Sequence, residues 1–326
     1  MIVFLIRRLI QACFVLIVIS LISFAIQDRL GDPVRQMVGM TVTPEVREQL
    51  REELGLNDGF LVQYARFAKN ALAGDFGTSY YYKEPTIDVI LKKVPATIEL
   101  ALCAILLVIL IATPFGIITA IKPRHVLSRL IMFISSIGLS IPIFIIAIFM
   151  VYLFSVQWNL APSFGRGETI MLFGIWESGL FTKDGLNHLL LPSLSLAIAL
   201  TPIFVRLIRS EMSEVLQSEY IRFAWSKGLS APRIYFFHAL KNTMLPIITI
   251  GGIQAGTLVA YTILTETIFQ WPGMGFLFMD AVSRVDTPLI STYLLVVGSM
   301  FVVMNTLVDL VYGLVNPTVR VASHGL

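Results

Sequence analysis

The stretch SEYIRFAWSKGLSAPR, residues 218–233, stands out from the chain around it. It contains charged residues, a Tyr, a Trp, a Gly and a Pro, although the flanking stretches 189–208 and 245–268 are strongly apolar. Apolar stretches of about twenty residues are typical of transmembrane helices. The sequence therefore predicts a polar loop that a membrane protein exposes to water between two spans.

The composition of the whole chain also indicates an integral membrane protein. Of its 326 residues, 56% are hydrophobic and 14% are charged, and the mean hydropathy is +0.81. The apolar stretches lack the alternation of barrel strands, and lipid requires each backbone group to be bonded within its own segment, so we expect helices. The predicted fold class is all-α, with six transmembrane helices over residues 5–26, 96–121, 127–156, 189–208, 245–268 and 289–315.

The first apolar stretch is predicted to be a retained span. It is longer than the apolar part of a signal peptide and lacks a small-residue cleavage site. Cys13 and Cys103 both fall inside apolar spans, so we expect small buried side chains and no disulfide. The net charge of +3 gives no indication of nucleic-acid binding.

The distribution of basic residues predicts the orientation, because Lys and Arg in short loops favour the cytoplasm. One side of the predicted membrane carries Arg7, Arg8, Lys122, Arg124, Arg129, Arg206, Arg209, Arg222, Lys227, Arg233, Lys241 and Arg320. The short segments on the other side carry few, namely Arg166, Lys183 and Arg284. We therefore expect both termini and the loop 209–243 to be cytoplasmic.

Residues 29–94 then lie outside and form a subdomain of short helices. The sequence TPE at 43–45 predicts the start of one helix, which Gly55 ends. A second helix is predicted over 60–72, before Gly74, with Tyr64, Phe67 and Leu72 roughly aligned. We expect the subdomain to pack against the spans, with direct contact to a solute as the alternative.

Several kinds of chemistry have no motif in this sequence. It contains no G-x-x-x-x-G-K-[ST], so it lacks a P-loop for ATP, and no H-E-x-x-H for zinc. The histidines are scattered over loops and span edges and predict no metal site: His125, His188, His238 and His324. The acidic residues of the spans lie toward the span ends, whereas ion-coupled carriers need such groups near the midplane. We expect structural roles for these three, Glu99, Glu266 and Asp309.

An intramembrane serine protease is the enzyme alternative, with Ser140 as nucleophile and His188 as base. A single Gly-x-Ser is expected by chance in such a chain, and His188 lies outside its predicted span. Ser140 is followed by Ile141 and Pro142, a sequence that instead predicts a kink in the third span. No catalytic residues are predicted.

The loop 209–243 is predicted to form two helices. The first, over 211–227, carries apolar residues on one face and ends at Gly228 in a left-handed cap. Ser230 caps the second, which leads into Leu245, Pro246 and the fifth span. An amphipathic helix can lie on lipid or dock into a groove of a soluble partner. Docking fits better, because Glu211, Glu214 and Glu219 offset the basic residues.

The loop also carries a resemblance. The sequence RFA at 222–224, followed after three residues by Gly228, resembles the E-A-A-x3-G loop of ABC importer permeases, although its first two letters differ. In that pattern I-x-L-P follows the loop, and here the corresponding Leu245-Pro246 comes about five residues later. Other stretches resemble the dipeptide/oligopeptide/nickel permease family over essentially the whole chain, closest to the dipeptide-type B subunit. They are GDPV (31–34), ELGL (53–56), GDFGTS (74–79), VPATIEL (94–100), HALKNTMLPIITI (238–250), LTETIFQWPGMG (264–275) and VDLVYGLVNPTVR (308–320).

The resemblance implies a type I ABC importer permease fold in a bacterial inner membrane. Its domains would be a cytoplasmic end with the first helix (1–28), an external subdomain (29–94), a permease core with the coupling loop (95–318) and a cytoplasmic tail (319–326). Its implied partners are a homologous second permease, two cytoplasmic ATPase subunits, an external solute-binding protein, a peptide substrate and membrane lipid, with no nucleic acid. ATP and Mg would be used by the ATPase subunits, and this chain would bind no cofactor and would not itself be an enzyme.

The resemblance and the polarity of the spans together predict three sets of site residues. The ATPase-coupling set is Tyr220, Arg222, Phe223, Ala224, Gly228, Leu229 and Ser230. The set joining the loop to the fifth span is His238, Asn242, Leu245 and Pro246. Candidates for the translocation path are Gln254, Thr257, Tyr261, Thr262, Ser299 and Asn305, for which hydrogen bonding between helices is the alternative.

The substrate stays open at this point, because in this family the binding protein largely sets specificity. A nickel chelate, glutathione, a haem-type ligand or an antimicrobial peptide could use the same architecture, as could a sensing role. An ion-coupled carrier and a protease are less favoured.

Overall fold

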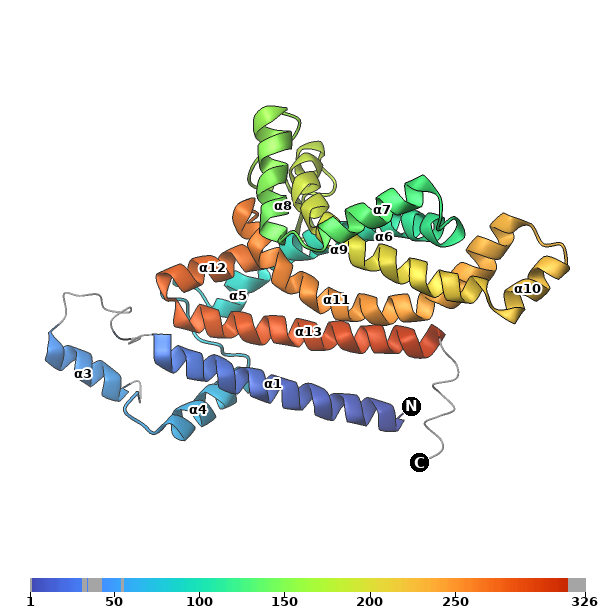
Figure 1. The fold of residues 1–326 in the computed structure, drawn as a ribbon. Helices are drawn as coiled ribbons and strands as arrows, with labels where there is room; N and C mark the ends of the chain where they lie inside the picture. Colours follow the sequence, from blue (N-terminus) through green and yellow to red (C-terminus); the bar gives the residue numbers. More distant parts are fainter. Residues whose placement is uncertain (1, 31–33, 35–42, 54–55, 316–326) are drawn as a thin grey trace. The chain divides into compact units, whose positions relative to one another are not determined.

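The computed structural model describes residues 2–30, 34, 43–53 and 56–315, which are mostly helical (Figure 1). They form two compact units, Met1–Pro95 with Pro272–Val303, and Ala96–Trp271 with Met304–Leu326. The first unit contains α1 (Ile2–Leu30), α3 (Pro44–Glu53), α4 (Phe60–Leu72), α5 (Thr86–Leu91), α12 (Met274–Arg284) and the first half of α13 (Thr287–Val315). The second contains α6 (Val94–Ile121), α7 (Val126–Gly138), α8 (Ile143–Met150), η1 (Val151–Gln157), β1 (Ile170–Leu172), β2 (Trp176–Ser178), α9 (Lys183–Leu216), α10 (Glu219–Ser226), η2 (Arg233–Ala239) and α11 (Leu240–Ile268).

Within the part of the chain that the structure describes, four helices are long and apolar enough to cross a membrane: Thr86–Ile121, Lys183–Leu216, Arg233–Ile268 and Thr287–Val308. The shortest has 22 residues, which at 1.5 Å per residue extend about 33 Å, enough for the hydrocarbon core. They correspond to the predicted second, fourth, fifth and sixth spans. The first predicted span lies within α1, a helix of 29 residues, and the apolar segment Ile10–Ile26 is the part of it whose side chains are described, so this span stays a prediction.

The third span is more sharply broken than predicted. The sequence predicts one kinked helix over 127–156, whereas α7 and the continuous helix Ile143–Gln157 are bent by 106°. Pro142 explains the break, because it has no N–H and disfavours helical backbone at the residue before it. Gly138 allows the end of α7 to pack closely against α9, since a Cβ at this position would lie 2.9 Å from Pro202 Cγ.

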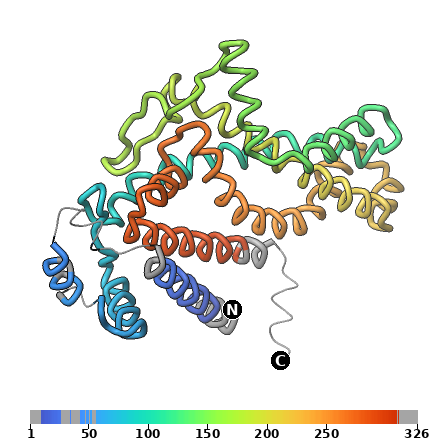
Figure 2. Tube along the Cα trace, turned by 60° about the vertical axis from the view of Figure 1, so that its left-hand side comes forward, coloured from blue at the N-terminus to red at the C-terminus, as the bar shows by residue number. Residues whose placement is uncertain are grey.

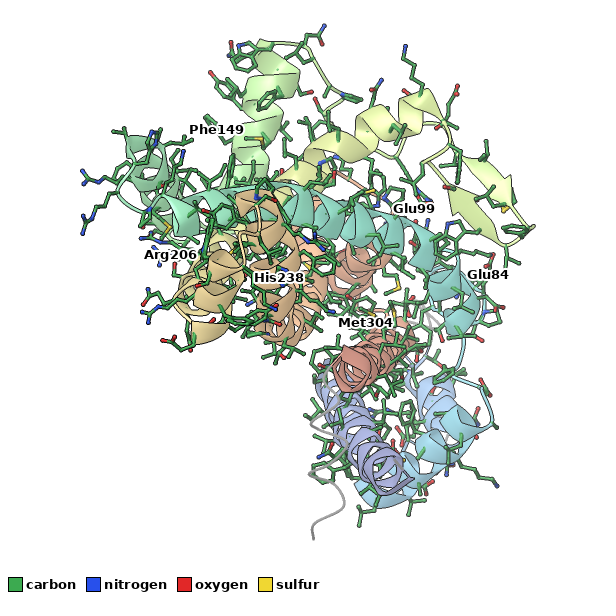
Figure 3. All side chains as sticks on the ribbon, turned by 90° about the vertical axis from the view of Figure 1, so that its right-hand side faces the viewer. Glu84, Glu99, Phe149, Arg206, His238 and Met304 are labelled. Atoms are coloured by element: carbon green, nitrogen blue, oxygen red, sulfur yellow. The ribbon has the colours of Figure 1, made fainter. Side chains whose placement is uncertain are left out.

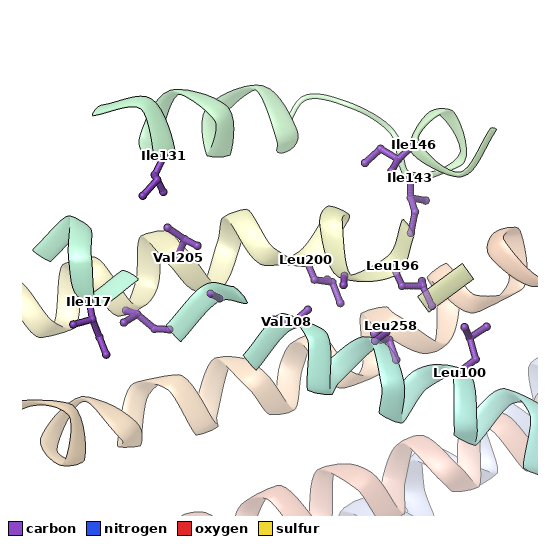
Figure 4. Close-up of a cluster of buried hydrophobic side chains, with 14 of the residues drawn as sticks. Leu100, Val108, Ile117, Ile131, Ile143, Ile146, Leu196, Leu200, Val205 and Leu258 are labelled. Atoms are coloured by element: carbon purple, nitrogen blue, oxygen red, sulfur yellow. The ribbon is translucent and has the colours of Figure 1, made fainter. Parts of the chain in front are cut away.

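The core of the second unit is aliphatic and lies between α6, α8, α9 and α11. Its buried side chains include Leu100 and Val108 on α6, Leu196 on α9 and Leu258 on α11 (Figure 4). Gly116 allows α6 to approach α9 closely, because a Cβ there would lie 2.6 Å from Ile208 Cβ. These helices therefore form one packed body.

The first unit is built on α1 and the first half of α13, which run side by side (Figures 1 and 2). Their contact is close, since a Cβ on Gly298 would lie 2.6 Å from Ile19 Cδ1. A second core joins α5, α12 and α13 through Ile90, Met274 and Leu289.

The short helices α3 and α4 begin where the sequence predicts. On α4, Tyr64 and Phe67 face α1, where Phe24 packs against both rings at centroid distances of 5.8 and 5.5 Å. Leu72 does not share this face as predicted and is 91% exposed. Five residues separate it from Phe67, which rotates it by about 140° around the helix.

Candidate functional site

The loop between α9 and α11 is a folded helical hairpin with a break that the sequence did not predict. Instead of one helix over 211–227, α9 ends at Leu216 and α10 begins after Ser218. Ser218 has extended backbone, with φ −68° and ψ 150°, and its hydroxyl donates to the carbonyl of Val215 at 2.7 Å. Serine competes for backbone hydrogen bonds in this way, which favours helix ends over helix interiors.

The end of α10 has the predicted left-handed cap. Gly228 has φ +73°, and its N–H donates to the carbonyl of Trp225 at 2.9 Å. The N–H of Leu229 donates to the carbonyl of Ala224 at 3.4 Å, which completes a Schellman motif. A Cβ on Gly228 would meet nothing within 4 Å, so glycine is favoured here by the backbone conformation and not by lack of space.

The second helix of the hairpin leads into α11. The carbonyl of Ser230 accepts from the N–H of Ile234 at 3.1 Å, and the backbone then continues as the π-helix η2 into α11. Tyr220 Oη shares a hydrogen bond with His238 Nδ1, and the two rings meet edge to face at 5.7 Å. Trp225 contacts Tyr235 in the same manner at 6.2 Å. These contacts fasten α10 to η2.

The hairpin has four buried side chains in its interior and five exposed aromatic side chains. Ile221 and Ala224 on α10 and Ile234 and Ala239 on η2 are buried and join the core. Ala224 therefore faces inward, whereas the sequence prediction assigned it to docking. The aromatic surface, as we call it here, consists of the exposed side chains Tyr220, Phe223, Trp225, Phe236 and Phe237.

Three members of the aromatic surface were missed as site residues, namely Trp225, Phe236 and Phe237. Their signal is present in the sequence, because aromatic side chains in a polar loop are candidates for recognition. Two basic residues lie beside these aromatic side chains. Arg222 forms an ion pair with Glu219 at 2.7 Å, and Lys227 Nζ lies 4.6 Å from the centre of the Phe223 ring.

The remaining residues of the joining set lie at the start of α11. Asn242 is exposed, and Leu245 and Pro246 are half-buried within the helix. Pro246 cannot donate to the carbonyl four residues earlier, that of Asn242, so α11 lacks one backbone hydrogen bond near the loop. His238 lies in η2, where it meets Tyr220 (Figure 3).

The candidates for the translocation path stay predictions. Gln254 and Tyr261 are half-buried on α11, and Thr257 and Thr262 donate to their own helix, to the carbonyls of Ile253 at 3.4 Å and Val259 at 2.7 Å. Ser299 donates to the carbonyl of Leu295 at 2.8 Å and belongs to the first unit, whereas Asn305 belongs to the second.

A buried ion pair lies at the end of α6 nearest Val94. Arg166 Nη2 donates to Glu99 Oε2 at 2.8 Å, and the two side chains are only 6% and 2% exposed. Glu99 also accepts from Trp176 Nε1 at 3.0 Å and from the Gly179 N–H at 3.3 Å, which holds the β1–β2 hairpin on α6 (Figure 3). The structural role expected for Glu99 is thus confirmed, although the sequence did not identify its partners.

The stretches VPATIEL and LTETIFQWPGMG meet beside this ion pair. Thr97 donates to Glu266 Oε1 at 2.7 Å, and Trp271 Nε1 donates to the carbonyl of Ala96 at 3.0 Å. Glu266 and Trp271 are fully buried. These hydrogen bonds join the start of α6 to the end of α11, so the two stretches serve packing.

Among the described residues, no group of three His, Cys, Asp or Glu side chains could hold a metal ion. Ser140 and His188, the two residues of the protease alternative, have other hydrogen-bonding partners. Ser140 donates to the carbonyl of Ser136 at 3.4 Å, and His188 Nδ1 lies 2.9 Å from the carbonyl oxygen of Asp184.

Apolar helices long enough to cross a membrane, joined by a folded polar loop, define the class, a multi-pass membrane protein. The chain belongs to the family of binding-protein-dependent transport system inner membrane components. The model of that family matches residues 112–321, and the model of its N-terminal part matches residues 1–101. The family predicted from the sequence is confirmed, and the protein is a permease subunit of an ABC importer in the inner membrane.

Individual relatives agree with this assignment. The chain is 37% identical over 337 residues to the dipeptide transport system permease protein DppB of Escherichia coli K12, covering 98% of this chain and 99% of that protein. It is 36% identical over 332 residues to DppB of Alkalihalophilus pseudofirmus, covering 98% and 100%. In fold it is similar to a chain of the MetNI methionine ABC transporter, with a TM-score of 0.55 and 16% identity over 71% of this chain and 97% of that one.

Proposed function

We propose that this chain forms one half of the translocation path for dipeptides and short oligopeptides, opposite a homologous second permease subunit. Two ATPase subunits, which bind ATP and Mg, would supply the energy, and one of them would dock on the aromatic surface. A solute-binding protein on the other side of the membrane would deliver the peptide. Similarity to dipeptide permeases along nearly the whole chain supports the substrate class.

The aromatic surface on a rigid hairpin is the observation that carries the coupling mechanism. Its five exposed rings offer apolar anchors, while the Schellman cap and the Tyr220–His238 contact hold α10 in place. From η2 the helix continues without interruption over Arg233–Ile268. A push on α10 would therefore move α11, which carries the path candidates Gln254, Thr257 and Tyr261. Such coupling needs an element with two positions that both partners bias.

Uptake into proteoliposomes tests the substrate class. The chain, purified with its second permease and ATPase subunits, is expected to import a labelled dipeptide when ATP and the loaded binding protein are present. Unlabelled di- and tripeptides should compete, whereas glutathione, a nickel chelate and haem should not. Import of one of these three with no import of dipeptide would overturn the substrate class and leave the subunit role intact.

The proposed orientation places Arg222 in the cytoplasm and Tyr80 outside. Single cysteines at these positions, with Cys13 and Cys103 replaced, are to be probed with a membrane-impermeant thiol reagent in intact cells. We expect labelling at position 80 and none at 222 until the cells are opened. The reverse pattern would invert the topology.

A further inference from the structure

Helix α4 has an apolar arc wider than its contact with α1. Phe60, Tyr64 and Phe67 lie within about 60° of one another around the helix and meet Phe24 of α1. Leu61 and Leu72 are eleven residues apart, close to three turns, so they share a second face about 100° away. They are 76% and 91% exposed. Part of the apolar arc is thus left uncovered by the described chain.

The contacts with α1 set the depth of α4. Ser20 Oγ and Tyr64 Oη share a hydrogen bond of 2.8 Å, and Phe24 is buried among the rings of α4. The apolar stretch of α1 ends at Ile26, before Gln27, Asp28 and Arg29. At 1.5 Å per residue, Ser20 and Phe24 lie about 9 and 3 Å inside that end. Because α4 touches α1 at these residues, it lies level with the last part of the span.

Most of the remaining long side chains of α4 are polar, although the exposed Val62 lies beside them. Gln63, Arg66 and Asn70 occupy the arc opposite Leu61, and Arg66 pairs with Asp58 at 2.5 Å. Lys69 is exposed at the edge of the apolar arc, where a lysine can extend its ammonium toward phosphate groups. Interfacial helices bury an apolar face about 5–10 Å into the boundary of headgroups and acyl chains and keep a polar face in water.

We propose that α4 lies in the surface of the bilayer, with Leu61 and Leu72 in contact with the acyl chains of the leaflet next to Ile26. The helix thereby fixes the depth of the predicted external subdomain 29–94 relative to the membrane. It also covers the end of α1 near Phe24. The occupant of the uncovered arc is lipid, because α4 lies level with the apolar stretch of α1, the predicted first span. This inference is independent of the substrate and of the coupling loop.

Spin labels on single cysteines test the proposal in the full-length chain with the subunits that co-purify with it. Leu61→Cys and Leu72→Cys place labels on the uncovered arc, and Asn70→Cys is the matched control, about 180° from Leu61 on the same helix. The background carries Cys13→Ala and Cys103→Ala, and the protein is reconstituted into nanodiscs of phosphatidylethanolamine and phosphatidylglycerol. Accessibility to oxygen, which enters lipid, is compared with accessibility to a water-soluble nickel chelate.

The expected result is a ratio of oxygen to nickel accessibility several-fold higher at positions 61 and 72 than at position 70. Equal nickel accessibility at all three positions would show that the arc faces water and would overturn the proposal. Exclusion of both reagents at 61 and 72, with immobilised labels, would show that another protein covers the arc and would also overturn it. Brominated lipids that quench a fluorophore at 61 and 72, but not at 70, give an independent check.

Discussion

Replacing Phe223 by aspartate is expected to release the ATPase subunits from the transporter and to abolish uptake, while the loop stays folded. Phe223 is 60% exposed, so the change alters the surface of the hairpin and not its core. In an apolar docking groove, however, an unpaired carboxylate costs several kcal/mol, and about 3 kcal/mol corresponds to a hundredfold loss of affinity.

The measurement is co-purification of the ATPase subunits with the variant. Phe223→Leu keeps an apolar side chain and is expected to retain them, and Gln217→Asp adds the same charge at an exposed position just before α10 and is also expected to retain them. Ala224→Asp is a poorer test, since Ala224 is buried and a charge there would disturb the hairpin itself. Normal recovery of the ATPase subunits with Phe223→Asp would reject the aromatic surface as their docking site.

Replacing Arg166 by leucine is expected to cost about 3–5 kcal/mol of stability, because Glu99 would remain as a buried carboxylate without its cation. The N–H groups of Trp176 and Gly179 and the Ser178 hydroxyl would still donate to it, but none of them carries a positive charge. The double variant Glu99→Gln with Arg166→Met removes both charges at similar size and is expected to recover most of the loss. Thermal unfolding of the purified protein in detergent measures both effects.

An unchanged unfolding temperature for Arg166→Leu would contradict the assignment of this pair as a dry structural contact. A double variant less stable than either single variant would also contradict this assignment. Each charged side chain would then make an important contact with a group other than its partner.

The sequence predicts the features of this fold that are local. Four spans follow from hydropathy alone, and Gly228 takes the conformation expected of glycine after a helix. The break at Pro142 was located correctly but its size was not, because a bend of 106° depends on packing such as that of Gly138 on Pro202. The second break, at Ser218, was missed, since serine is compatible with both a helix interior and a helix start.

Contacts between distant residues were beyond such prediction. Arg166 and Glu99 are 67 residues apart, and nothing in their neighbouring residues indicates that they pair. The inward position of Ala224 was likewise hidden, because a small residue suits both a docking surface and a packed interior. The aromatic surface could have been identified more fully, since its rings cluster in one polar loop.

A measurement of ATP hydrolysis distinguishes a permease subunit driven by ATPase subunits docked on its loop 209–243 from a carrier that works alone. The purified chain is to be compared with the chain bound to its second permease and ATPase subunits, with and without the loaded solute-binding protein. We predict no hydrolysis by the lone chain, hydrolysis by the complex that the loaded binding protein alters, and loss of this response with Phe223→Asp. Two results would contradict a permease subunit that depends on separate ATPase subunits. One is ATP hydrolysis that follows this chain through denaturing purification and refolding, and the other is transport by the lone chain driven by a proton gradient.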